Sequence, residues 1–168
     1  MEFKKIQLNG FKSFAEKADF LIEDGLTGIV GPNGCGKSNI VESLRWAMGE
    51  TSAKSMRGSG MEDVIFSGTS NKASKNIAEV TIEVVNTDKE GPIQYREHDQ
   101  IQIKRKIEKD KGSKFYINGK EVRARDAQMF FADLSTGAHS PSMISQGRIG
   151  ALVTAKPTDR RAILEEAA

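Results

Sequence analysis

The sequence predicts an α/β fold in which an antiparallel β-meander lies beside a partial mixed or parallel core. Two patterns support this: an apolar run that passes through a glycine-rich loop into helical spacing, and a middle third in which apolar and polar residues alternate. The chain has 168 residues, of which 38% are hydrophobic and 29% charged. This length suffices for one domain with a real core, and the composition excludes a disordered tail.

The first part of the chain is expected to alternate short strands with one helix. Strands are predicted at residues 3–8, 18–22 and 26–30, the last an apolar run bounded by glycine. Helical spacing follows from residue 38 to Gly49, which is placed to end the helix. The inward stripe of this helix is predicted to comprise Ile40, Val41, Leu44, Ala47 and Met48, with Trp46 packed between helix and sheet.

The middle third alternates cleanly, which is typical of half-buried strands. Strands are expected over 77–86, 101–107 and 115–119, the last entering an Asn118-Gly119 turn. A short helix is expected over 61–66, and Ala127, Phe130, Phe131 and Leu134 show helical spacing again. Residues 157–168 open with Pro157 and stay helical to the last residue, with no glycine or proline stop. The chain is therefore expected to be cut within a longer helix.

Composition excludes several classes of protein. No apolar run reaches the roughly 20 residues of a membrane helix, and the N-terminus lacks a secretory signal. One cysteine, Cys35, excludes an internal disulfide framework, so a cytosolic protein is expected. The formal net charge is +2, but residues 96–125 carry ten basic and five acidic side chains, a local +5. Such a segment is either an electrostatic footprint for nucleic acid or the solvated face of a sheet.

Residues 31–38, GPNGCGKS, match the phosphate-loop pattern G-x-x-x-x-G-K-[ST] at every required position. Glycines let such a loop wrap closely, so that its N–H groups converge on phosphates. The following helix directs its positive dipole end at them. Lys37 supplies a point charge and Ser38 a hydroxyl ligand for Mg²⁺. The pattern predicts a nucleotide site, although kinases, GTPases and many ATPases share it.

Hydrolysis also requires a carboxylate for the metal and the water, normally at the end of an apolar strand. Residues 20–24 and 129–133 end in acids, but the first precedes the loop and the second has helical spacing. Residues 134–138, LSTGA, resemble an ATPase signature sequence without its second glycine. The chain is therefore expected to carry nucleotide-binding parts without the catalytic carboxylates.

Several segments together resemble a known family. They are GFKSF at 10–14, GPNGCGKSNI at 31–40, RWAMGE at 45–50, KSMRGSGMEDVIFSGT at 54–69, ISQGRI at 144–149 and DRRAILEEAA at 159–168. The whole chain, in this order, resembles the N-terminal head segment of bacterial structural maintenance of chromosomes (SMC) proteins.

The resemblance implies a P-loop ATPase head of the ABC type, split in two. Residues 1–156 would form its N-terminal lobe and 157–168 the root of a long coiled coil, with the missing carboxylates in an absent C-terminal lobe. Two such heads would dimerise around two ATP molecules with Mg²⁺, and hydrolysis would drive DNA entrapment or loop extrusion in chromosome condensation and segregation. Implied partners are the C-terminal lobe, a second head, sequence-independent DNA, and kleisin and accessory subunits, all in the cytoplasm at the nucleoid and none in a membrane. The alternatives are a nucleotide-gated DNA clamp and a repair-type coiled-coil head, each with little turnover.

The resemblance also implies roles for single residues. Lys37, Arg57 in an arginine loop and Gln146 in a glutamine loop would act in catalysis, and Ser38 and Gln146 would bind Mg²⁺. The implied nucleotide contacts are Pro32, Asn33, Gly34, Cys35, Gly36, Lys37, Ser38, Asn39, Lys12, Ser13 and Asp63. Asp63 has a plainer interpretation as the cap of the short helix over 61–66. Candidate DNA contacts, taken from the basic segment, are Lys104, Arg105, Lys106, Lys120, Arg123 and Arg125.

Overall fold

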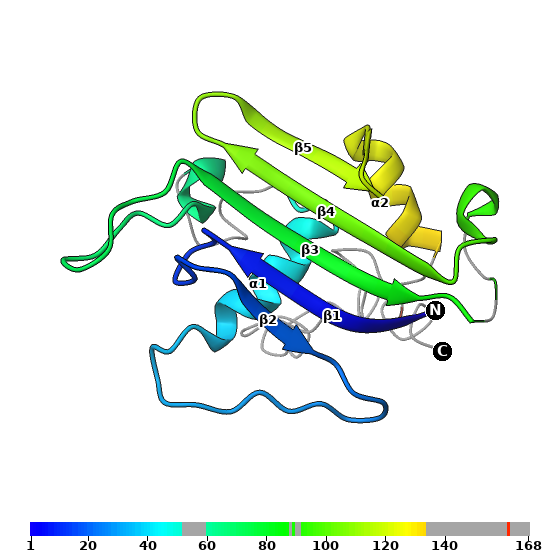
Figure 1. Cartoon of the computed structure of the whole chain (residues 1–168), viewed down its shortest axis with the longest axis horizontal. Coiled ribbons are helices and arrows are strands. Elements are labelled where there is room, and N and C mark those ends of the chain that lie inside the picture. Colours follow the sequence, from blue (N-terminus) through cyan, green and yellow to red (C-terminus); the bar gives the residue numbers. More distant parts are fainter. Residues whose placement is uncertain (52–59, 88, 90–91, 134–160, 162–168) are drawn as a thin grey trace.

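The computed structural model describes residues 1–51, 60–87, 89, 92–133 and 161. Within these residues the chain forms one six-stranded sheet with strand order β2-β1-β3-β4-β5-β6, and every neighbouring pair is antiparallel (Figure 1). The strands are β1 (Glu2–Asn9), β2 (Ala18–Leu21), β3 (Ile77–Val85), β4 (Gln100–Glu108), β5 (Gly112–Ile117) and β6 (Lys120–Val122). The predicted meander of the middle third is confirmed.

Alternation of side chains determines which face of the sheet is buried. The partners Ile82 and Ile103 lie on the inner face, and Val84 lies opposite Ile101 in the same layer. The predicted Asn118-Gly119 turn joins β5 to β6, with φ of 48° at Asn118 and 79° at Gly119. Positive φ at both positions is the geometry that favours Asn-Gly in two-residue hairpins.

Among the described residues two α-helices contact the sheet, α1 (Lys37–Ala47) with β3 and β4, and α2 (Ala124–Asp133) with β5. Figure 1 shows α1 behind the strands, so that one face of the sheet points toward the viewer. The core between α1 and the sheet includes Trp46, which is fully buried as expected. The connections contain two short 3-10 helices, η2 (Met61–Val64), which confirms the predicted short helix, and η3 (Ile93–Tyr95).

The buried stripe of α1 is rotated from the one predicted. Ile40, Ala47 and Met48 are buried as expected, but Val41 is 37% exposed, while Glu42 and Ser43 are buried. Hydrophobicity alone misplaced the stripe because polar side chains that find partners can also be buried. Gly49 ends the helix as predicted, with φ of 109° and its N–H donating to the Trp46 carbonyl at 3.1 Å.

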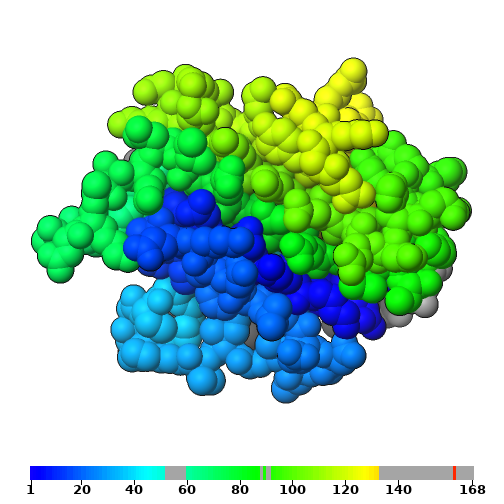
Figure 2. Space-filling view, viewed as in Figure 1, coloured from blue at the N-terminus to red at the C-terminus, as the bar shows by residue number. Residues whose placement is uncertain are grey.

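The strand predicted at 26–30 is wrong. These residues have no strand geometry in the structure, and Leu26 and Val30 are 99% and 93% exposed. A strand requires a neighbour that accepts its backbone hydrogen bonds, and the six described strands pair only with one another. The parallel pairing expected in the core is therefore not seen among the described residues, and residues 22–36 run along the outside of the β2 edge (Figures 1 and 2).

Candidate phosphate-binding site

The glycine-rich loop at 31–38 wraps into the N-terminus of α1 as predicted. Gly34 and Gly36 have φ of 84° and 97°, values that L side chains rarely adopt. The Lys37 ammonium donates to the carbonyl oxygens of Gly31 and Pro32 at 2.6 and 2.7 Å. The side chain thus folds back over its own loop. Its ammonium is held by backbone carbonyls of the loop. A bound anion could replace these carbonyls as the acceptor.

The loop at 10–14 packs against this turn. Asn39 Nδ2 on α1 donates to Ser13 Oγ at 2.9 Å. A Cβ added to Gly36 would come within 2.6 Å of the same Ser13 oxygen. Gly36 is thus required both for its positive φ and for the close approach of Ser13. The structure brings Ser13, Gly36 and Asn39 together, and their contact with a nucleotide stays a prediction.

Lys12 is held differently from the prediction that it reaches toward the nucleotide. Its ammonium forms an ion pair with Glu42 of α1, and both side chains are largely buried, at 13% and 10% exposure. Its backbone has φ of 46°, and its N–H donates to the Val64 carbonyl at 2.7 Å. Lys12 therefore ties the loop at 10–14 to both α1 and η2. The role of Lys12 at the phosphates stays a prediction.

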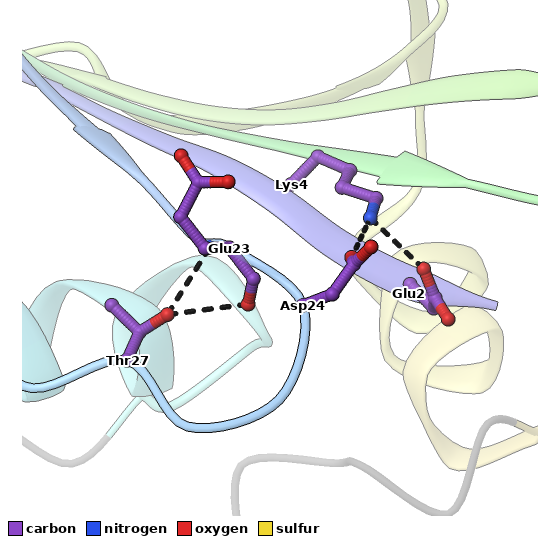
Figure 3. A network of polar contacts seen from close by, with 5 residues as sticks. All are labelled: Glu2, Lys4, Glu23, Asp24 and Thr27. Atoms are coloured by element: carbon purple, nitrogen blue, oxygen red, sulfur yellow. Dashed lines mark hydrogen bonds and ion pairs between the residues drawn. The ribbon is translucent and has the colours of Figure 1, made fainter.

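Polar contacts attach the segment before the phosphate loop to strand β1. Figure 3 shows the Lys4 ammonium between Asp24 and Glu2, 3.0 Å from the Glu2 carboxylate. The hydrogen bond to Asp24, followed by the one to Glu2, raises the pKa of Lys4 above its ordinary value. Thr27 Oγ1 accepts from the Glu23 N–H at 3.1 Å and donates to the Glu23 carbonyl. The segment is fixed by surface hydrogen bonds, while its apolar residues Leu26 and Val30 face solvent.

Asp63 occupies the position of a helix cap. Its Oδ2 accepts the N–H of Gly60 at 2.8 Å, and its own N–H donates to the Gly60 carbonyl at 3.2 Å. This reciprocal pair stabilises the first turn of η2. The plainer of the two interpretations of Asp63 thus has a structural basis, and a nucleotide contact by Asp63 stays a prediction.

The donor set around α1 fits a magnesium-bound polyphosphate. The loop provides an ammonium on Lys37, an exposed hydroxyl on Ser38 and the N–H groups at the start of α1. The first turn of α1 has no acidic residue, and no side chain caps it, so its positive dipole end is not neutralised locally. Cys35 Sγ lies 3.8 Å from the Lys37 ammonium, which agrees with a position inside the loop. Arg57, Gln146 and the helix expected at 157–168 lie outside the described residues, apart from Arg161, which is helical and exposed.

Five of the six candidate DNA contacts lie on accessible parts of the surface. The prediction for the sixth, Arg105, is wrong because its side chain is buried. Lys120, Arg123 and Arg125 are exposed around β6 and the start of α2, and Lys104 and Lys106 are half-buried on the outer face of the sheet. Lys106 is 3.6 Å from Glu79. Arg105 is only 3% exposed and points inward toward α1. It lies between Ile103 and Ile107 in the strand alternation, a signal that predicts an inward side chain.

Sequence reasoning also missed several polar partners. Glu42 pairs with Lys12, Glu50 with Arg45 at 3.1 Å, and Gln128 Nε2 donates to the Gly49 carbonyl at 3.0 Å. The partners of Lys12 and Gly49 are 30 and 79 residues away in sequence. No local pattern signals contacts over such separations.

A comparison with protein-family models identifies the family. The model of the RecF/RecN/SMC N terminal domain matches residues 2–148. The chain belongs to this family. Curated relatives include proteins named Chromosome partition protein Smc from Rhodopseudomonas palustris, 54% identical over 168 residues, and from Mycobacterium tuberculosis, 44% identical. Each alignment covers 100% of this chain but only 15% and 14% of the relative.

Solved structures of SMC heads have the same fold. One chain, described under ATP-driven dimerization and DNA stimulated activation of SMC ATPases, superposes with a TM-score of 0.88 at 30% identity and full coverage of both chains. An SMC head bound to the C-winged helix domain of ScpA gives a TM-score of 0.91 at 31% identity, covering 99% of this chain and 51% of that one. These matches confirm the predicted family and the N-terminal head fold. None of the described helices is long and apolar enough to cross a membrane.

Proposed function

We propose that this chain is the ATP-binding half of an SMC ATPase head that works in chromosome condensation and segregation. The observation that carries the proposal is the geometry of residues 31–38. A phosphate loop opens α1, with the Lys37 ammonium folded over it and Ser13 packed against Gly36. The identity to proteins named Chromosome partition protein Smc over the full chain supports the same function.

The residues of the loop have distinct tasks in this proposal. The Lys37 ammonium exchanges its two carbonyl acceptors for phosphate oxygens, and the N–H groups of residues 33–38 hold the polyphosphate at the positive end of α1. Ser38 supplies its hydroxyl to Mg²⁺, together with Gln146. ATP, when bound, supplies the free energy and joins two heads. Arg57 and Gln146 complete the catalytic set, and Lys12, Ser13 and Asp63 border the site.

The second half of the head covers the apolar segment at 26–30. Leu26 and Val30 are almost fully exposed in this chain and Ile29 is 46% exposed, and this exposure of three large apolar side chains in one short segment supports an interaction surface there. In the proposal the C-terminal lobe packs on this segment, which leads into the phosphate loop. That lobe brings the hydrolytic carboxylate and the signature sequence. Residues 1–168 alone then bind ATP weakly and do not turn it over, and residues 157–168 begin the coiled coil.

The remaining partners follow from the same assignment. A second copy of the head dimerises with this one around ATP, and kleisin and accessory subunits bind the complete molecule at the nucleoid in the cytoplasm. DNA binds without sequence preference to the half-buried Lys104 and Lys106 and to the exposed Lys120, Arg123 and Arg125. Hydrolysis separates the heads and drives DNA entrapment or loop extrusion.

ATP turnover by the full-length protein tests the proposal. Phosphate release is measured with and without double-stranded DNA, for the wild type and for Lys37→Ala. We expect turnover that DNA stimulates and that the substitution abolishes, whereas Lys111→Ala on the exposed β4–β5 turn leaves it unchanged. The effect of DNA is expected to weaken steeply with salt, because phosphate contacts release counterions.

Two results distinguish the alternatives. ATP-dependent dimerisation without measurable turnover would identify a nucleotide-gated clamp. A short coiled coil in the full-length protein, in place of one of several hundred residues, would identify a repair-type head. Sustained turnover by residues 1–168 alone, lost in Lys37→Ala, would contradict the split site.

A further inference from the structure

Arg105 is a buried cation in the middle of the hydrophobic core. It is 3% exposed, and its neighbours across the strands are Val80 on β3 and Phe115 on β5. Its guanidinium carbon lies 4.5 Å from the centroid of the Trp46 ring and 4.6 Å from that of Phe115. A charge at such a position is expensive unless hydrogen bonds and aromatic faces compensate for lost water.

The compensation comes from the C-terminal end of α1. Arg105 Nη1 donates to the carbonyl oxygens of Trp46 and Glu50, both at 2.7 Å, and Nη2 donates to Ser113 Oγ at 3.2 Å. Carbonyls at the end of a helix lack partners within the helix and carry its negative dipole end. The Arg105 side chain thus caps the helix, bonds the chain beyond it, and lies over two aromatic rings.

The charge of Arg105 is retained at neutral pH. Burial lowers the pKa of the guanidinium to about 10, and the nearby Glu50 carboxylate opposes that shift. Glu50 is itself 2% exposed in its side chain and is bound to Arg45 at 3.1 Å. The end of α1 therefore holds a compact group of charges whose geometry is determined by hydrogen bonds.

The same helix carries the phosphate loop at its other end. Lys37 and Ser38 are the first residues of α1, and Trp46 lies in its last turn. A helix of 11 residues is a rigid rod about 16 Å long. Any shift or rotation at the capped end is therefore transmitted to Lys37 and Ser38. Gln128 of α2 supports the same end through the Gly49 carbonyl.

We propose that Arg105 is a positioning residue for the nucleotide site: by clamping the C-terminal end of α1 to β4, it sets the placement of Lys37 and Ser38 at the other end. The inference rests on the proposed ATP-binding function and adds to it a residue that touches neither nucleotide nor metal. In this proposal Arg105, on the inner face of β4, supports the phosphate loop through α1, whereas Lys104 and Lys106 lie on the outer face of the same strand.

Three variants of the full-length protein test this role. Arg105→Met keeps the length of the side chain and removes every donor, Arg105→Lys keeps the charge without the planar fork, and Lys111→Met removes a charge from the exposed turn of the same hairpin. Two quantities are measured below the melting temperature of each variant. One is the Kd for a fluorescent ATP analogue with Mg²⁺. The other is the alkylation rate of Cys35 without nucleotide, followed by peptide mass spectrometry.

We expect Arg105→Met to weaken analogue binding about tenfold and Arg105→Lys about threefold, in the range found for changes that act through packed contacts. Both are expected to change the rate at which Cys35 is alkylated, because the loop around it moves. Lys111→Met is expected to match the wild type. If Arg105→Met does not fold, Arg105→Lys carries the test, because an ammonium lacks the planar group that stacks on the rings and the second nitrogen that donates to Ser113.

Two outcomes overturn the proposal. One is a lower melting temperature with unchanged Kd and unchanged Cys35 alkylation, which would make Arg105 purely structural. The other is equal weakening by Arg105→Met and Lys111→Met, which would be a general effect of charge. If the wild type itself does not bind the analogue, the proposed ATP-binding function fails instead, so the two failures are distinguishable.

Discussion

The sheet and the segment before the phosphate loop are built on different principles. The sheet with α1 and α2 buries a continuous core in which Leu8, Ile82, Ile103 and Trp46 are 0% exposed. Residues 22–30 are held by surface hydrogen bonds, such as those at Lys4 and Thr27 (Figure 3). Leu26 in this segment is almost completely exposed. The sheet and its helices are stabilised by their own buried core. The segment before the phosphate loop lies on the surface, where it is accessible to ligands and to other proteins.

The largest expected effect is on the free energy of unfolding, which a substitution in the core lowers far more than one in the segment before the phosphate loop. Trp46→Ala is expected to lower the free energy of unfolding by about 3–5 kcal/mol, because it opens a cavity between α1 and the sheet. Leu26→Ala is expected to change it by less than about 0.5 kcal/mol, since the side chain contacts mostly solvent. Urea unfolding of the 168-residue chain measures both values. Similar losses for the two variants would contradict the contrast.

Glycine substitutions sharpen the contrast inside the loop. Gly36→Ala is expected to cost about 1–2 kcal/mol and to abolish ATP binding, because it strains a positive φ and brings Cβ against Ser13 Oγ. Gly34→Ala is the matched control, since its φ is also positive but nothing lies within 4 Å of the added Cβ. Calorimetric titration with ATP and urea unfolding measure the two effects. Equal results for both variants would show that the Ser13 contact is immaterial.

The ion pair between Lys12 and Glu42 joins the loop at 10–14 to α1, and its coupling is measurable. A double-mutant cycle with Lys12→Met and Glu42→Gln isolates the pair, and we expect a coupling energy of about 1 kcal/mol in the free energy of unfolding. The value should exceed that of an exposed pair because both side chains are largely buried. Additive losses within experimental error would mean that the pair does not hold the loop at 10–14 to α1.

The smallest expected effect concerns pH at the sheet edge. The hydrogen bond from Gln7, assisted by Lys5, lowers the pKa of Asp19 on β2 below its ordinary value. Its contribution to stability is therefore complete above pH 4 and is lost as the pH falls through the lowered pKa. Asp19→Asn is expected to flatten the stability profile slightly between pH 4 and pH 2. A steeper loss of stability at low pH in Asp19→Asn would show that the Asp19 carboxylate does not stabilise the fold as its lowered pKa implies.

Sequence alone could predict the strands whose side-chain alternation is matched by a neighbouring strand in the sheet. Strict alternation predicted β3 and β4, and the positive-φ preference of Asn-Gly predicted the turn into β6. It failed at 26–30, where an apolar run has the composition of a strand but no described neighbour to pair with. Strand formation depends on partners that are distant in sequence, so such a run cannot be placed from its own residues.

The candidate site shows the same limits. The loop at 31–38 could be predicted because its chemistry is local and its spacing specific. Ser13 could be placed beside it only through family resemblance. Charge suggested that Arg105 is exposed, although its register with Ile103 and Ile107 predicts burial. The carbonyls that accept its hydrogen bonds are 55 and 59 residues away, and no pattern in the sequence connects them.

Calorimetric titration of the full-length protein with ATP and Mg²⁺ tests the central claim most directly. The wild type is expected to bind through the loop at 31–38, and Lys37→Ala to bind at least tenfold more weakly, about 1.4 kcal/mol, while its melting temperature stays unchanged. Lys111→Ala serves as the matched loss of one lysine. Equal affinity of Lys37→Ala and the wild type would contradict the assignment of residues 31–38 as the phosphate-binding site.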